Sequence, residues 1–144
     1  MSQDADQLAK ACADAMWAND QASSGLGMQI DKVEQGFAQL SMSIRKDMLN
    51  GQEIGHGGFI FTLADSAFAF ACNTYNQFAV AQHCSVSFLA PVYLNDRLTA
   101  TAVERNRTTR SGIYDVTVVN QKGETVAEFR GHSRTVKGQH IPDL

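Results

Sequence analysis

The chain has 144 residues, of which 44% are hydrophobic and 19% are charged, and its formal net charge is −3 at pH 7. This length predicts one domain spanning residues 1–144, and this composition excludes an intrinsically disordered tail. The acidic balance argues against a nucleic-acid-binding protein. No apolar run approaches the roughly 20 residues of a membrane span, and the acidic N-terminus is unlike a signal peptide. We therefore expect a cytoplasmic protein that does not contact a membrane.

The cysteines and the charge distribution narrow the class further. Cys12, Cys72 and Cys84 are scattered and form no CxxC pair, which argues against a disulfide framework and a zinc site. The four histidines have no metal-ligand spacing either, so we expect no bound metal. Residues 1–96 hold four Lys or Arg against ten Asp or Glu, whereas residues 97–144 hold eight against five. The basic second part fits either ordinary surface variation or a contact for an anionic small molecule.

The N-terminal third predicts a helix followed by two strands. Apolar residues at helical spacing indicate a short N-terminal helix over residues 4–19, which ends before a break at residues 23–25. Residues 28–34 and 38–44 then alternate between apolar and polar side chains. This alternation is typical of strands with one buried face.

The rest of the chain centres on an apolar helix. A glycine-rich loop over residues 50–58 precedes FIFTLADSAFAFACN, which is apolar nearly all the way round and should therefore be buried on all sides. Four strand-like segments with short connections follow at residues 79–90, 97–107, 113–120 and 124–136. The order predicts an α+β fold in which a curved antiparallel sheet encloses one long central helix.

Asp65 is the only acidic or basic side chain between His56 and His83, and it lies in the middle of the apolar helix. A buried carboxylate without partners is costly, so it either becomes neutral or finds hydrogen-bond donors. One interpretation is a structural aspartate bonded to a neighbouring loop. The other is a catalytic base or nucleophile at a cleft, because perturbed carboxylates gather at such places.

The sequence His56-Gly57-Gly58 precedes the helix, where backbone N–H groups have no partner within the helix. Together with the helix dipole, these groups can hold an oxyanion, and glycine permits close approach of a substrate. Gly57 and Asp65 are about 12 Å apart along one helix, too far to act on one carbonyl. A second protomer with an antiparallel helix would bring Asp65 to the partner's Gly57. The spacing therefore predicts an obligate two-fold dimer with two shared sites.

Other candidates in this region carry weaker signals. His56 could act as a base, although the adjacent glycines indicate that its backbone matters as much as its ring. Ser66 could hold a water or a carboxylate, and Cys72 is a small core residue without a nearby base. The patterns GxSxG, GxGxxG and GxxxxGKS/T are absent, which disfavours serine hydrolases, dinucleotide enzymes and P-loop enzymes.

The segment MLNGQEIGHGGFIFTLADSAFAFACNT resembles the loop-and-helix signature of the hotdog-fold acyl-CoA thioesterases, and within them the phenylacetic acid degradation (PaaI) subfamily. The similarity extends to AMWANDQASSGLGM, to FLAPVYLNDRLTATA and to RSGIYDVTVVNQKGETVAEFRGHSRTV, and so covers roughly residues 10–137. The resemblance implies a hotdog fold and hydrolysis of coenzyme A thioesters, with aryl-acetyl groups such as ring-hydroxylated phenylacetyl as the acyl class. It also implies no metal or redox cofactor, and tetramers built as dimers of dimers.

The resemblance implies roles for individual residues at the helix. Asp65 matches the family's acid, which attacks the thioester carbonyl or activates water. Gly57, with His56, matches the oxyanion position at the helix start. Asn19 and Asn50 match polar positions near the reacting group, and Ser66 sits where the PaaI pattern commonly carries a hydroxyl.

Substrate binding requires further residues, because the phosphates of coenzyme A need cationic or N–H donors. Gly58 belongs to the loop that a substrate would approach. Cations at the hairpin turn NRTTRSG and near the end of the last strand are candidates for the phosphates. These are Arg107, Arg110, Arg134 and Lys137.

Two other functions fit the same residues. A hotdog acyl-CoA hydratase or dehydratase would pair an acid with a histidine, for which His56 is available. A non-catalytic acyl-CoA-binding or regulatory module would have no need of Asp65 inside an apolar helix. An assay of CoA release against crotonyl-CoA hydration separates the two enzymatic alternatives.

Overall fold

The computed structural model of the chain describes residues 3–142. Its helices are α1 (Gln3–Trp17), α2 (Gln21–Gly25) and α3 (Gly57–Cys72), with a short 3-10 helix at Lys46–Met48. Its strands are β1 (Gln29–Glu34), β2 (Phe37–Ser43), β3 (Ala79–Phe88), β4 (Arg97–Arg107), β5 (Ser111–Val119) and β6 (Thr125–Thr135). The predicted N-terminal helix, central helix and six strands are confirmed in the predicted order, and α2 is added.

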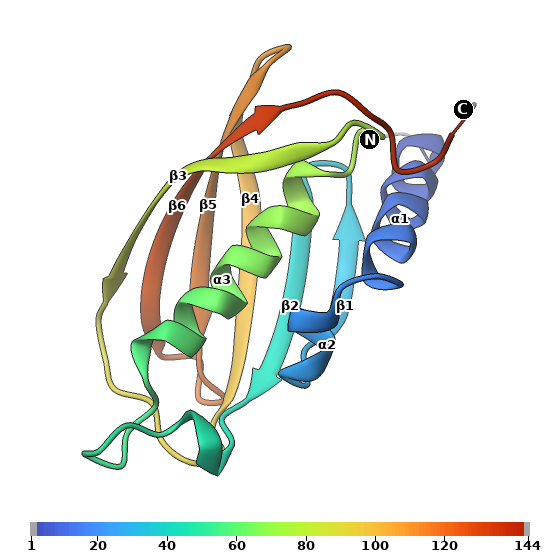
Figure 1. Cartoon of the computed structure of the whole chain (residues 1–144). Coiled ribbons are helices and arrows are strands. Elements are labelled where there is room, and N and C mark those ends of the chain that lie inside the picture. Colours follow the sequence, from blue (N-terminus) through green and yellow to red (C-terminus); the bar gives the residue numbers. More distant parts are fainter. Residues whose placement is uncertain (1–2, 143–144) are drawn as a thin grey trace.

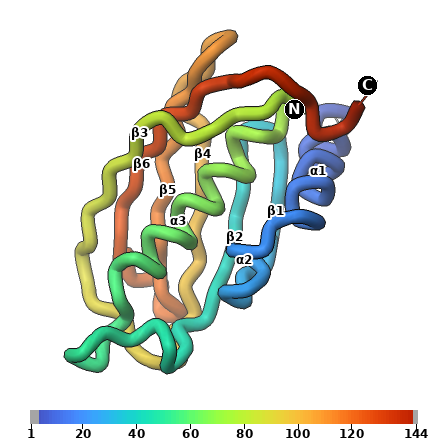
Figure 2. Tube along the Cα trace, in the orientation of Figure 1, coloured from blue at the N-terminus to red at the C-terminus, as the bar shows by residue number. Residues whose placement is uncertain are grey.

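The six strands form one antiparallel sheet in the order β1-β2-β4-β5-β6-β3, so β1 and β3 are its edges. The hairpins β1–β2, β4–β5 and β5–β6 join neighbouring strands, whereas α3 carries the chain from β2 to the far edge at β3. The sheet curves around α3, and α1 packs beside β1 (Figures 1 and 2). This arrangement confirms the hotdog fold predicted from the sequence.

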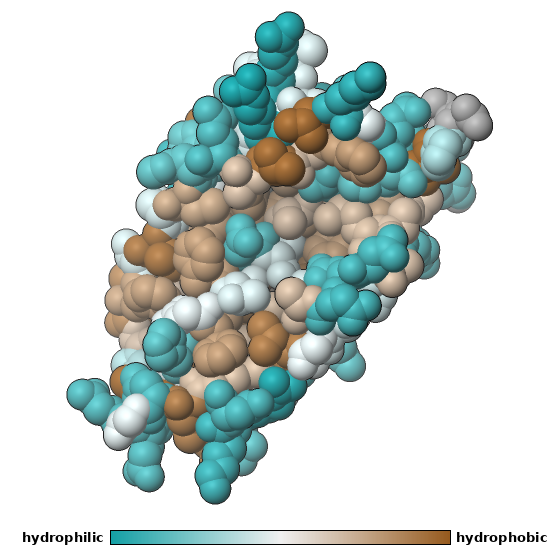
Figure 3. Space-filling view, in the orientation of Figure 1, coloured by the Kyte–Doolittle hydropathy of each residue, from teal (hydrophilic) through white to brown (hydrophobic). Residues whose placement is uncertain are grey.

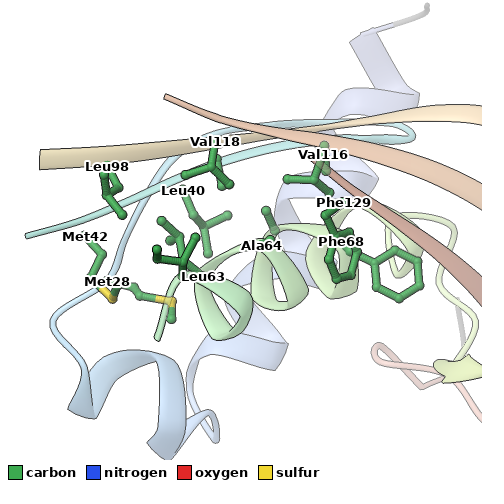
Figure 4. Close-up of a cluster of buried hydrophobic side chains, with 14 of the residues drawn as sticks. Met28, Leu40, Met42, Leu63, Ala64, Phe68, Leu98, Val116, Val118 and Phe129 are labelled. Carbon is green, nitrogen blue, oxygen red and sulfur yellow. The ribbon is translucent and has the colours of Figure 1, made fainter. Parts of the chain in front are cut away.

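The concave face of the sheet and α3 together form the main core. β4 and β5 alternate between buried and partly exposed residues, so one row of side chains on each strand meets the helix. Leu63 and Phe68 of α3 pack against this row in Figure 4. Phe68 also lies directly over Gly131 of β6, where a Cβ atom would stand 2.8 Å from the ring. A glycine is therefore needed for the ring to reach the sheet.

The short helix α2 corrects the expectation of a simple break at residues 23–25. Asp20 caps this helix by accepting a hydrogen bond of 2.8 Å from the Ser23 N–H. The Ser24 hydroxyl adds a bond of 2.8 Å to the Asp20 carbonyl. Side-chain caps of this kind satisfy the free groups at helix ends, so one helical turn forms where the residue types indicated none.

The outer face of α3 also differs from the sequence expectation, because the sheet does not bury the helix on all sides. Thr62, Asp65 and Ala69 share one helical face, and each is partly exposed. Figure 3 shows a band of apolar surface on this side of the molecule. The reason is geometric, since six strands curve around only part of the helix. Within residues 3–142, no helix is long and apolar enough to cross a membrane.

Candidate active site

The start of α3 presents a free backbone N–H at Gly57. His56 caps the helix, and its Nδ1 accepts a hydrogen bond of 2.9 Å from the Gly58 N–H. The His56 N–H donates to the Met48 carbonyl at 2.8 Å, and the Phe59 N–H donates to the His56 carbonyl at 3.0 Å. The Gly57 N–H has no acceptor among residues 3–142. It can donate to a substrate oxygen, supported by the positive end of the helix dipole.

A mostly apolar pocket of about 380 Å³ opens beside Gly57. The Phe88 ring forms one wall, and this side chain is 51% exposed. A Cβ atom on Gly57 would stand 3.0 Å from the ring, so glycine leaves room for a carbonyl to reach the N–H. The other lining residues are Asn50, Ile54, Gly55, Ile60, Leu89, Ala90, Pro91 and Val92.

Asn50 shapes the loop that lines this pocket with Asn50, Ile54 and Gly55. Its Oδ1 accepts hydrogen bonds from the Gln52 N–H at 2.9 Å and from the Ile54 N–H at 3.4 Å. The Asn50 N–H donates to the Ile54 carbonyl at 2.8 Å. These bonds close the loop on itself, while the Nδ2 group of Asn50 keeps its donors free among the described residues. The loop is therefore organised before a ligand arrives.

Asp65 lies eight residues after Gly57 on the partly exposed face of α3. Its carboxylate has no hydrogen bond and no ion pair to another residue in the described part of the chain. Burial raises the pKa of this carboxyl above its ordinary value of 3.8, because the charged form loses hydration. A carboxylate with a raised pKa and free oxygens is a stronger base than an ordinary surface aspartate.

Two thiols near Asp65 are not reactive groups. Burial raises the pKa of Cys72 to about 12, and the charge of Asp65 acts in the same direction. Burial, and to a smaller extent the charge of Asp65, also raises the pKa of Cys84. Both thiols therefore stay protonated at neutral pH, and a protonated thiol is a poor nucleophile. Between residues 3 and 142, no group of three or more His, Cys, Asp or Glu could hold a metal ion.

Ser66 and Asn19 lie on other surfaces than the free carboxylate. The Ser66 hydroxyl is 2.8 Å from the hydroxyl of Ser23, so it ties α3 to α2. Asn19 is exposed in the turn between α1 and α2, where its N–H donates to the Met16 carbonyl at 3.2 Å. No hydrogen bond joins the Asn19 side chain to α3 in the described range. The chain thus brings Ser66 next to Asp65 in sequence but orients it toward α2.

The cations predicted from the sequence gather at one end of the sheet. Arg107 and Arg110 flank the β4–β5 hairpin, and Arg134 pairs in register with Ser111 at the end of β6. Lys137 lies two residues beyond the end of β6, and all four side chains are exposed. None of the four forms an ion pair with a carboxylate within residues 3–142. Their positive charge is therefore available to an anion.

Sequence reasoning missed two features of this region. The Arg107 guanidinium stacks on the ring of Tyr75, and the pocket at Gly57 is walled by Phe88. Tyr75 belongs to no motif or periodic pattern, and the alternation over residues 79–90 places Phe88 on a strand face without showing what its ring meets. Both residues lie far from their partners in the sequence, so only the folded chain reveals these contacts.

A long helix inside a curved sheet carries a carboxylate of raised pKa and a free N–H, and both are groups that acyl-transfer chemistry can use. The family model described as the thioesterase superfamily matches residues 53–127, and the chain belongs to this family. It is a thioester hydrolase.

Known relatives point in the same direction. The chain is 45% identical over 126 residues to the acyl-coenzyme A thioesterase PaaI of Escherichia coli, covering 88% of this chain and 90% of that protein. The structure of the E. coli PaaI protein superposes with a TM-score of 0.92 at 43% identity, over 93% of this chain and 97% of that one. A mutant of PaaI from Thermus thermophilus superposes with a TM-score of 0.78 at 37% identity, over 81% of this chain and 100% of that one.

Proposed function

We propose that the protein hydrolyses aryl-acetyl-CoA thioesters, including ring-hydroxylated phenylacetyl-CoA, to the free acid and CoA. The observation that carries the proposal is the pair of groups on α3, the unpaired Asp65 carboxylate and the free Gly57 N–H. The apolar pocket beside Gly57 supports an aromatic acyl group. The E. coli relative is named an acyl-coenzyme A thioesterase and is described as a protein of the phenylacetic acid degradation operon, which supports the same substrate class.

A complete site requires a second copy of the chain in this proposal. Eight residues of helix separate Gly57 from Asp65 by about 12 Å, which exceeds the reach of two groups acting on one carbonyl. β3 is an edge strand whose Val80 and Phe88 are 50% and 51% exposed. Pairing two β3 edges about a two-fold axis would satisfy this edge and align the helices antiparallel. Asp65 would then face Gly57 of the partner subunit.

The proposed assembly is a homodimer with two shared sites, and two dimers joined as a homotetramer. The partly exposed apolar band over α3 supports an interface there, because large apolar surfaces on a small protein mark contact sites. Its occupant in this proposal is a second copy of the same chain.

Asp65 and the partner's Gly57 act on the same thioester carbonyl in the proposed mechanism. In the first route, ionised Asp65 takes a proton from a water that attacks the carbonyl carbon, and the C–S bond of the tetrahedral intermediate then breaks. In the second route, the carboxylate attacks the carbon itself, the C–S bond breaks as the anhydride forms, and water then hydrolyses the anhydride. In both routes the Gly57 N–H donates a hydrogen bond to the negatively charged carbonyl oxygen, and CoA leaves as a thiolate that takes up a proton. A thiolate leaves readily, so this route requires no metal or redox cofactor.

Several polar residues support this chemistry in the proposal. His56 binds the Gly58 N–H and so orients the start of α3. Ser66 anchors α3 to α2 beside the reacting carboxylate. Asn50 offers its amide donors to the pocket, whereas the place of Asn19 near the reacting group rests on the family resemblance alone, because Asn19 is exposed in the turn between α1 and α2.

A CoA-release screen tests the proposed function. We expect turnover of phenylacetyl-CoA and its hydroxylated analogues to exceed that of straight-chain acyl-CoAs. Asp65→Asn should lower kcat by at least about 10²-fold, the low end for general-base catalysis, while Asp31→Asn on the exposed surface of β1 serves as the matched control. Folded Asp65→Asn protein with wild-type turnover would refute the assignment. Hydration of crotonyl-CoA without CoA release would show a hydratase instead.

A further inference from the structure

The turn between α3 and β3 holds the side chain of Arg107 in place. The guanidinium carbon of Arg107 lies 3.6 Å from the ring centroid of Tyr75, in stacking distance. Its Nη2 donates a hydrogen bond of 3.0 Å to the Oε1 of Gln77. The Nε and Nη1 groups of Arg107 have no acceptor in the described part of the chain. The Tyr75 ring thus fixes one face of the guanidinium and Gln77 fixes Nη2, while the Nε and Nη1 donors remain unpaired among the described residues.

Arg107 differs from its neighbours because its partners are uncharged. Arg105, two residues earlier on β4, pairs with Asp115 at 2.9 Å, and Arg130 pairs with the same carboxylate at 2.6 Å. Asp115 neutralises much of the charge of both arginines. An aromatic ring and an amide orient the Arg107 side chain without neutralising it. This combination suits a cation that must later bind an anion.

Tyr75 is itself anchored, so it can position another side chain. Its hydroxyl donates to the Oε1 of Glu104 at 2.8 Å, and the hydroxyl of Tyr114 donates to the same oxygen at 3.0 Å. Burial, and then the hydrogen bond to Glu104, raise the pKa of Tyr75 to about 12. The ring therefore stays neutral and remains a hydrogen-bond donor across the physiological pH range.

We propose that Tyr75 and Gln77 are positioning residues that hold the Arg107 guanidinium ready for a phosphate group of the CoA nucleotide. A stacked, planar guanidinium presents its free edge to a phosphate, and orienting it beforehand reduces the side-chain freedom lost on binding. Arg110, Arg134 and Lys137 add positive charge at the same end of the sheet. This inference rests on the proposed function, because it assigns the nucleotide half of the same substrate.

The position of the turn suits this role. Tyr75 follows Asp65 by ten residues, just beyond the C-terminal end of α3. A thioester bound at Asp65 would leave its nucleotide extending away from the reacting carbonyl. The β4–β5 hairpin and the end of β6, which carry the other cations, lie toward the same end of the molecule as the C-terminal end of α3 (Figure 1).

Kinetics with two substrates and direct binding of CoA test the inference. The substrates are phenylacetyl-CoA and the phenylacetyl thioester of pantetheine, which lacks the nucleotide, and calorimetry with CoA gives a Kd that needs no turnover. Arg107→Ala should raise KM for the CoA thioester and Kd for CoA about tenfold, and Tyr75→Leu about threefold, with kcat unchanged. Tyr75→Phe keeps the ring but loses the hydrogen bond to Glu104, so its KM and Kd should lie between those of wild type and of Tyr75→Leu. Arg105→Ala, which removes an equal charge from the same strand, is the matched control.

The following results test the inference separately from the proposed function. The pantetheine thioester should show no KM change in any variant, and Tyr75→Leu combined with Arg107→Ala should be no worse than Arg107→Ala alone. If Arg107→Ala weakens CoA binding and Tyr75→Leu does not, the inference is wrong and the phosphate contact stands. Equal KM penalties on both substrates would mean that Tyr75 only supports the fold, which also overturns the inference.

If Tyr75→Leu does not fold, Gln77→Leu takes its place. We expect Gln77→Leu to lose CoA affinity twofold to threefold, and an unchanged CoA affinity would refute the inference. Wild-type protein that binds CoA but hydrolyses no thioester would refute the proposed function alone.

Discussion

Two inactive variants should restore activity when they share a dimer. Asp65→Asn removes the base of a site but leaves the Gly57 N–H intact. Gly57→Val leaves Asp65 intact but places a branched side chain where even a Cβ atom would stand 3.0 Å from the Phe88 ring, so it blocks the approach to the N–H. Because the two groups lie about 12 Å apart on α3, a shared site takes one from each chain. A mixed dimer then contains one complete site and one doubly damaged site.

The expected activity follows from counting sites. Random association of equal amounts of the two variants yields mixed dimers as about half of all dimers, and about half of their sites are complete. The mixture should therefore recover about a quarter of wild-type CoA release, and mixed dimers purified with two different affinity tags about half. Asp65→Asn mixed with the double variant Gly57→Val/Asp65→Asn is the matched control and should stay inactive. Purified mixed dimers with no more activity than their parents would refute the shared site.

Three further predictions concern pH, substrate charge and the core. Because burial raises the pKa of Asp65, the acid limb of the pH–activity profile should lie above the ordinary carboxyl pKa of 3.8. The folded chain binds the Asp65 proton more tightly than the unfolded chain, so the ionised carboxylate destabilises the fold at pH 7. Asp65→Asn should therefore have a higher Tm than wild type at pH 7, and equal Tm values would contradict this expectation. Arg107→Ala combined with Arg110→Ala should raise KM for the CoA thioester with kcat unchanged, and the penalty should shrink as salt rises; an equal penalty on the pantetheine thioester would exclude a phosphate contact. Phe68→Ala, which removes a buried ring packed 5.8 Å from that of Phe129, should lower the free energy of unfolding in urea by about 3–5 kcal/mol, and a loss below about 1 kcal/mol would show that the core closes around the gap.

Local patterns were sufficient to predict most of the fold. Strands β2 and β4 bury the apolar residues that alternate in their sequences, although Ser41 of β2 is buried as well. This period of two is visible in the sequence without any knowledge of the partner strands. The long apolar run of α3 likewise indicates a helix that needs a surrounding sheet. The short connections between β4, β5 and β6 predicted hairpins, and the register of these strands confirms them.

Local patterns also drew attention to Asp65 and Gly57, because a lone carboxylate in an apolar helix is unusual and follows the glycine pair at the helix start by eight residues. The helical rise alone separates the two groups, so the expectation of a shared site needed only their spacing. The roles of Asp65 and Gly57 remain predictions that the experiments above address.

Contacts between distant segments were decided only by the tertiary structure. The open outer face of α3 and the stacking of Arg107 on Tyr75 depend on which surfaces meet after folding. The Asp20 cap of α2 joins residues three positions apart, so it is a local feature that the sequence analysis missed. The sequence by itself determined the repeat of the apolar pattern in each helix and strand and the positions of Asp65 and Gly57, since these features depend on neighbours along the chain. The tertiary structure decided which cations lack a carboxylate and what they meet instead, because that depends on distances between residues far apart in the sequence, such as Arg107 and Gln77, which lie 30 positions apart.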